Sequence, residues 1–166
     1  MTTRAVRPHL PASGQPAVAA ERLARSVDRA GEGGHRQALR LPRPDLRAPR
    51  EAREFSARVL RSWGVDGPLI ENARLITSEL ATNAVLHCPR SGGIVVLVTL
   101  ARGRAVITVI DPGPWREAVS LRAAGPGDER GRGLPLVAAL ADEWAPYPHI
   151  RRTAVYAALR LDRPAC

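Results

Sequence analysis

Apolar side chains in the first half of the chain recur three and four positions apart, which is the spacing of an amphipathic helix. Residues 49–63 predict one such helix, with Gly64 as its stop. Residues 68–88 predict a second, longer helix, whose apolar stripe consists of Ile70, Ala73, Ile76, Leu80 and Ala84. Ahead of both helices, residues 35–42 favour an edge strand that ends at a proline-rich turn.

The second half of the chain changes to a period of two. Residues 94–101 and 104–111 are rich in Val, Ile and Thr and are joined by a short Gly-containing turn, which predicts an antiparallel hairpin. Residues 151–161 alternate in the same way and predict a last strand. Between them, residues 112–133 have no clear periodicity, and residues 134–145 predict a short apolar helix. Because structureless loops of this length are uncommon in compact domains, we expect the segment 112–133 to be functional.

This order of elements indicates an α+β fold with one domain. We predict a two-layer α/β sandwich, in which one mixed, mostly antiparallel sheet carries its helices on one face. The domain is expected to span residues 36–161. Residues 1–35, rich in Arg, Pro, Gly and Ala, predict a flexible tail with room for a short amphipathic stretch at residues 17–30. Residues 162–166 are expected to be a frayed C-terminus.

The composition makes some classes of function less expected for this protein. The net charge is +9, and all 25 basic residues are Arg, a bias typical of a GC-rich genome. Ten of them fall in the first 50 residues, outside most of the predicted core, and aromatic residues are only 4% of the chain. Nucleic-acid binding is therefore not expected as the main function. The sequence contains neither a membrane-spanning apolar run nor a secretion signal, so we expect a cytoplasmic protein without a membrane partner.

Three polar residues lie four positions apart in the second predicted helix, in the sequence SELATNAVLHC. Glu79, Asn83 and His87 therefore stack on one helical face, although apolar residues flank them. A solvated polar face is one interpretation. The other is a site, because Glu and Asn one turn apart offer two oxygens to a hard cation such as Mg²⁺.

Two further segments carry candidate chemistry. In VIDPGPW, Asp111 ends an apolar strand, and Gly113 allows a flat ligand to approach the backbone. In GDERGRGLPLV, Gly131 and Gly133 precede a helix, which is typical of an anion cradle. An ordinary turn and an ordinary helix cap are the alternative interpretations of these two segments.

The order of these segments is more specific than any one of them. With SELATNAVLHC, VIDPGPW, DERGRGLPLVAALADEW and RRTAVYAAL, the chain resembles the GHKL ATP-binding family over residues 37–161. Within that family it resembles the branch of anti-sigma-factor serine/threonine kinases. The resemblance implies a Bergerat-type ATP-binding fold with ATP and Mg²⁺ as cofactors.

The resemblance also implies roles for single residues. Glu79 would be the general base, Asn83 would hold Mg²⁺, and His87 matches a residue common in the branch. Asp111 would accept a hydrogen bond from the adenine amino group, with Gly113 allowing the ring to lie close. The remaining implied site residues are the end of the phosphate lid and the threonine that supports the adenine site: Gly131, Arg132, Gly133, Leu134 and Thr153.

The function expected from this resemblance is an ATP-binding regulatory protein. A serine/threonine kinase that phosphorylates an anti-sigma-factor antagonist is the first hypothesis, with the antagonist, a sigma factor or both as its protein partners. A non-catalytic ATP-binding module that sequesters a partner, or an ATPase, is the alternative. The partners would be proteins, and the resemblance also allows a homodimer.

Overall fold

The computed structural model of the chain describes residues 34–42, 45–87, 92–113, 133–149 and 152–161. Its elements, in chain order, are β1 (His35–Leu41), α2 (Ala48–Ser62), α3 (Gly67–His87), β2 (Ile94–Ala101), β3 (Arg104–Asp111), α4 (Gly133–Leu140), β4 (Glu143–His149) and β5 (Arg152–Arg160). Most of the predicted tail, most of the predicted loop and the predicted C-terminal end lie outside the described residues.

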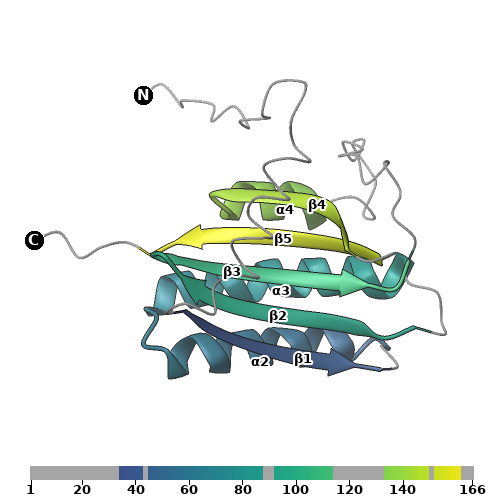
Figure 1. The fold of residues 1–166 in the computed structure, drawn as a ribbon, viewed down its shortest axis with the longest axis horizontal. Helices are drawn as coiled ribbons and strands as arrows, with labels where there is room; N and C mark the ends of the chain where they lie inside the picture. Colours follow the sequence, from purple (N-terminus) through teal and green to yellow (C-terminus); the bar gives the residue numbers. More distant parts are fainter. Residues whose placement is uncertain (1–33, 43–44, 88–91, 114–132, 150–151, 162–166) are drawn as a thin grey trace, which may run out of the picture.

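The strands form one five-stranded sheet in the order β1-β2-β3-β5-β4 (Figure 1). The predicted hairpin is confirmed, because β2 and β3 are antiparallel, with Val96 opposite Val109. Every other described pairing is antiparallel as well, so the sheet is not mixed as the sequence predicted. The α+β class is confirmed.

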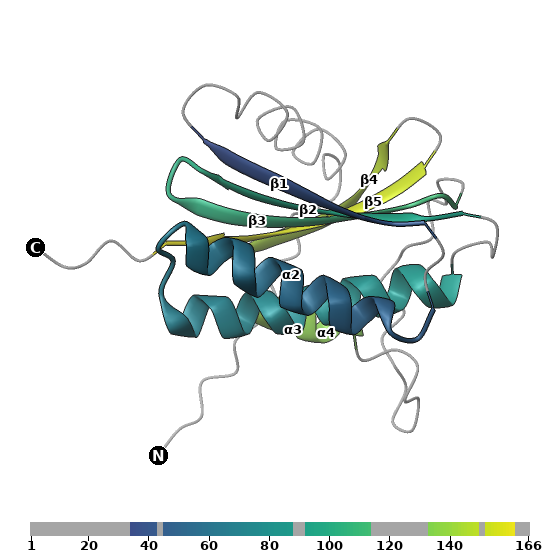
Figure 2. The same ribbon diagram turned by 90° about the horizontal axis from the view of Figure 1, so that it is seen from below.

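All three described helices cover the same face of the sheet (Figure 2). The chain enters α2 through a turn in which the Asp45 carboxylate accepts a hydrogen bond from the Arg47 amide at 2.7 Å. The helix ends at the predicted stop. Gly64 has a φ of 73° there, a left-handed backbone conformation that costs glycine little free energy. The amide of Val65 then reaches back to the carbonyl of Leu60 at 3.1 Å, which satisfies an orphan carbonyl of the last turn.

Alternate residues of each strand point to opposite faces, and this divides the core in two. On the helix-facing side, β3 contributes Ala105, Ile107 and Val109 to a main core that also contains the apolar stripes of α2 and α3. The alternation predicted for the last strand is confirmed. Ala157 and Leu159 join the main core, whereas Ala154, Tyr156 and Ala158 lie in a second cluster on the other face.

The region after α4 corrects the sequence prediction. The apolar helix predicted over residues 134–145 ends at Leu140, and Glu143–His149 is the strand β4. Pro146 and Pro148 are unfavourable within a central strand, because proline cannot donate a ladder hydrogen bond. In the described sheet β4 pairs with β5 alone, as an edge strand, where a missing donor on the outer side costs nothing.

Candidate functional site

The polar stripe of the second predicted helix lies in the middle and C-terminal part of α3. Glu79 and Asn83 are half-buried, and their neighbours Leu80 and Ala84 are buried in the main core. Because these apolar neighbours fix the rotation of α3 against the sheet, the carboxylate and the amide are presented in a defined direction. The stripe is therefore partly shielded from solvent, unlike an ordinary solvated helix face.

Gly133, the first residue of α4, lies directly against this stripe. A Cβ atom on Gly133 would come within 2.7 Å of Glu79 Oε2 and within 3.3 Å of the Asn83 side-chain nitrogen. Real Cβ atoms essentially never come as close as the first of these distances, so the approach of backbone to carboxylate depends on glycine here. The start of α4 and the polar face of α3 thus form one cluster, although the residues lie 50 positions or more apart in the sequence.

A second cluster lies where β3 ends. The amide of Gly113 donates a hydrogen bond to Asp111 Oδ1 at 2.7 Å, so the carboxylate is folded over the turn that follows the strand. Thr153 is the cross-strand partner of Asp111, and its hydroxyl donates to the Gly113 carbonyl at 3.3 Å. The beginning of β5 therefore supports the turn after β3. Figures 1 and 2 both show this end of β3 on the same side of the molecule as the C-terminal half of α3.

Sequence analysis missed one residue of this region. Gly92, which the sequence did not mark as a site residue, is packed so closely on the Pro112 ring that it leaves no room for a side chain. Pro112 lies between Asp111 and Gly113, so the contact helps to hold the turn that carries both. The Gly-Gly pair at 92 and 93 was the available signal, but a close approach of distant backbone cannot be inferred from a glycine alone.

The remaining predicted site residues are placed as follows. His87 is the last residue of α3, and its side chain is outside the description. Gly131 and Arg132 lie outside the described residues. Leu134 is in the first turn of α4, and its half-buried side chain packs against the main core.

The donor set around Gly133 suits a magnesium nucleotide better than a resident metal ion. Among the described residues, no group of three or more His, Cys, Asp or Glu side chains could hold a metal. Mg²⁺ in phosphate-transfer sites takes one or two protein oxygens and completes its shell with phosphates and water. The Asn83 amide carries an oxygen of this kind, the Glu79 carboxylate lies beside it, and the N-terminus of α4 next to both favours negative charge.

The family comparison agrees with this arrangement. Residues 43–162 match the sequence model of the family described as histidine kinase-like ATPase domain. The chain belongs to this family, which confirms the predicted GHKL resemblance and implies ATP binding. A search of the curated proteins found no significant match.

Two solved structures show related folds. The chain is 25% identical to the structure of the RsbU and RsbW domains of Rv1364c from Mycobacterium tuberculosis, with a TM-score of 0.60. That match covers 79% of this chain but only 34% of the other. The SiaB–SiaC complex from Pseudomonas aeruginosa matches with a TM-score of 0.58 at 13% identity, covering 86% of this chain and 99% of the other, and shows a shared fold alone. The likeness to an RsbW-containing protein agrees with the branch that the sequence resembles.

The described part of the chain contains no helix that is both long and apolar enough to span a membrane.

Proposed function

We propose that this protein is a serine/threonine kinase of the anti-sigma-factor type, which uses Mg-ATP to phosphorylate a protein antagonist. The observation that carries the proposal is the approach of Gly133 to Glu79 and Asn83, which joins a carboxylate, an amide oxygen and a helix N-terminus in one cluster. The likeness to a protein with an RsbW domain supports the choice of substrate class. The SiaB–SiaC complex, in which a related fold occurs, is an assembly with a partner protein.

In this proposal each cluster has a separate task. Bound Mg-ATP would supply the phosphoryl group. Glu79 would accept the proton of the attacking hydroxyl, and Asn83 Oδ1 would hold the ion. Asp111 would accept a hydrogen bond from the adenine amino group, and the turn at Gly113 is held for this by Thr153. Gly131, Arg132, Gly133 and Leu134 would supply amides to the phosphates, and His87 would lie at the edge of the site.

Binding is tested first, by the shift of the melting temperature with Mg-ATP. A ligand at 100 times its dissociation constant stabilises the folded state by about 2.7 kcal/mol. We expect a clear upward shift for the wild type and its loss in Asp111→Asn, which replaces an acceptor oxygen by a donor. Absence of any shift at millimolar Mg-ATP would reject the kinase and the ATPase together.

Phosphoryl transfer is tested next with γ-labelled ATP and a candidate anti-sigma-factor antagonist from the same genome. The control is the antagonist with its acceptor Ser or Thr replaced by Ala. We expect label on the antagonist only, and we expect Glu79→Gln to retain the melting shift but to lose transfer. Phosphate release without labelled protein would favour the ATPase. A melting shift with neither product would favour the partner-sequestering module.

A further inference from the structure

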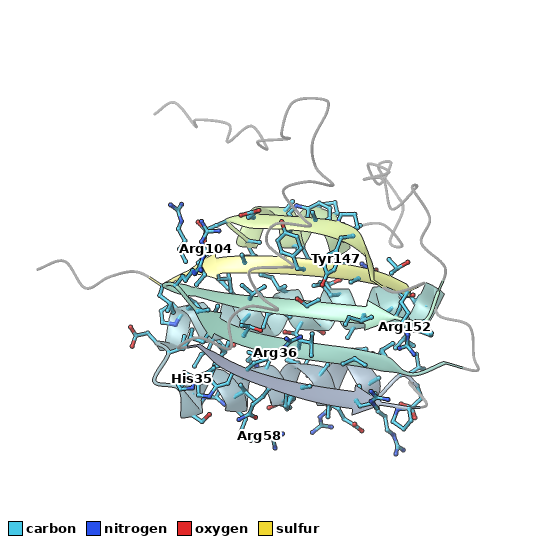
Figure 3. The ribbon with its side chains drawn as sticks, viewed as in Figure 1. His35, Arg36, Arg58, Arg104, Tyr147 and Arg152 are labelled. Atoms are coloured by element: carbon cyan, nitrogen blue, oxygen red, sulfur yellow. The ribbon has the colours of Figure 1, made fainter. Side chains whose placement is uncertain are left out.

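The turn of residues 111–113, which we name the Asp111 turn, lies at one end of the sheet, between two neighbouring strands. At this end β1 and β3 finish, and β2 and β5 begin, because all these pairings are antiparallel. Figure 3 labels Arg152, the first residue of β5, at this end and His35, the first residue of β1, at the opposite end. The Asp111 turn therefore has the start of β2 on one side and the start of β5 on the other.

Gly92, two positions before β2, packs directly on the Asp111 turn. A Cβ atom on Gly92 would overlap Pro112 Cγ and would lie 2.6 Å from Pro112 Cβ, and real Cβ atoms essentially never come within 3.0 Å of such a neighbour. The proline ring is closed onto its own backbone, so it cannot turn aside as a long side chain can. The contact between these two residues therefore leaves no room for any side chain at position 92.

The backbone at Gly92 has little space to move away from Pro112. The next residue, Gly93, packs just as tightly on the end of β1, where an added Cβ atom would lie 2.7 Å from the Leu41 carbonyl oxygen and 2.8 Å from Pro42 Cα. Because β1 and β3 lie on opposite sides of β2 in the sheet, the glycine pair fills the space between the end of β1 and the Asp111 turn. A displacement at position 92 is therefore passed on to Pro112.

Within the turn, the position of Pro112 determines the direction of the Asp111 carboxylate. A residue that precedes proline is restricted to extended backbone conformations, so Pro112 limits the backbone of Asp111. The Gly113 amide donates to Asp111 Oδ1 at 2.7 Å, which fixes the rotation of the carboxylate. On the β5 side, the Thr153 hydroxyl donates to the Gly113 carbonyl at 3.3 Å. The carboxylate is therefore oriented from both sides, by Thr153 through Gly113 and by Gly92 through Pro112.

We propose that Gly92 and Pro112 are positioning residues that determine the base selectivity of the nucleotide site. The inference rests on the proposed function, in which Asp111 accepts a hydrogen bond from the adenine amino group. Hypoxanthine has an oxygen in place of that amino group, so it presents an acceptor to the carboxylate and the hydrogen bond is lost. A displaced carboxylate discriminates less between the two bases, whereas the phosphate contacts at the start of α4 are unaffected.

Isothermal titration of the full chain with Mg-ATP and with Mg-ITP tests the selectivity. We expect the wild type to bind ATP at least about tenfold more tightly than ITP, because a hydrogen bond to a charged group is lost with hypoxanthine. In Gly92→Ala we expect the affinity for ATP to fall close to that for ITP, while the affinity for ITP stays near its wild-type value. The control is Leu97→Ala, a buried position in the middle of β2, which is expected to lower the melting temperature and to keep the ATP preference.

The outcomes separate this inference from the proposed function. A wild type that bound neither nucleotide would reject the proposed function and the inference with it. Equal binding of both nucleotides by the wild type would overturn the selectivity but leave ATP binding intact. A full ATP preference in Gly92→Ala, or an equal loss of the preference in Leu97→Ala, would overturn the positioning role alone.

Pro112→Ala provides a second test that adds no atoms to the packed region, in case Gly92→Ala does not fold. This substitution removes the ring carbons that lie against Gly92, together with the restriction on the backbone of Asp111. We expect a smaller ratio of ATP to ITP affinity than in the wild type, measured by the same titration. If Pro112→Ala kept the wild-type ratio, the ring would not orient the carboxylate and the proposal would be overturned.

Discussion

A substitution at Gly133 is expected to change the proposed reaction without changing the stability of the fold. A Cβ atom there would meet Glu79 Oε2, the far end of a flexible side chain, which can move away at little cost. We therefore expect Gly133→Ala to fold with nearly unchanged stability but to displace the carboxylate, with at least about a tenfold loss of phosphoryl transfer, equivalent to about 1.4 kcal/mol. Labelled-ATP transfer and thermal melting measure the two effects separately.

The control for this substitution is Gly67→Ala. Gly67 begins α3, and an added Cβ atom there would meet nothing within 4 Å. We expect this variant to keep both the stability and the transfer rate. If Gly133→Ala behaved in the same way as Gly67→Ala, the carboxylate beside Gly133 would have no role in the reaction.

Thr153 is the second residue for which we predict a specific effect, in this case on the affinity for nucleotide. Its hydroxyl is buried and donates to the carbonyl of Gly113, so Thr153→Val removes a single support of the turn that carries Asp111. A net hydrogen bond is worth about 1 kcal/mol, and we expect a roughly fivefold weaker affinity for Mg-ATP. Isothermal titration measures it, and Thr153→Ser, which keeps the hydroxyl, is expected to restore the affinity. Equal affinity of the Val variant and the wild type would contradict the prediction.

Only part of the site could be predicted from single residues. The four-residue spacing of Glu79 and Asn83 is visible in the sequence because the helical period fixes which side chains share a face. The proximity of Gly133 to them was implied only by the family resemblance, since no local pattern relates α4 to α3. The contact between Gly92 and Pro112 could not be predicted at all, because it exists only after β2 and the turn beyond β3 are brought together.

At the scale of elements, the strands β2, β3 and β5 were predictable from the sequence, and the edge strand β4 was not. β2, β3 and β5 carry their pattern in their own residues. β4 is a strand because β5 supplies its hydrogen-bond partners, with Ala145 opposite Tyr156 and Pro146 opposite Val155. Tertiary pairing outweighs the unfavourable local preference of proline there.

A carboxylate between α4 and β4 links this region to the end of β5. Asp142 accepts hydrogen bonds from the backbone amide of Arg160 at 2.7 Å and from its Nε at 2.8 Å. Burial acts to raise the pKa of Asp142, but the hydrogen bonds and the charge of Arg160, together with Arg104, outweigh it and hold the pKa below 3.8.

This pKa shift predicts a pH dependence of stability. The stabilisation by the ionised carboxylate is fully present above the unfolded pKa near 3.8 and is lost as the pH falls through the lower folded value. We expect Asp142→Asn to melt below the wild type at pH 7, and the difference to shrink as the pH is lowered past 3.8. Melting curves across this range measure it. A difference that is constant with pH would show that the ionised form contributes nothing.

For the whole molecule, the two faces of the sheet carry two separate apolar clusters. The helix-facing cluster contains residues of α2, α3 and α4 as well as of the strands. The cluster on the other face includes Leu97, Val106, Ile110 and Tyr147. Burial of apolar side chains on both faces of the sheet contributes to the stability of the fold.

We predict that Leu97→Ala, a substitution in this second cluster, lowers the melting temperature, because it removes buried apolar contacts and leaves a cavity. A buried Leu→Ala substitution costs about 2–5 kcal/mol, and each kcal/mol corresponds to roughly 3–5 °C for a domain of this size. Thermal melting measures the effect, and Leu75→Ala, at an exposed position of α3, is the matched control. Equal melting temperatures of the two variants would show that the second cluster does not contribute to stability.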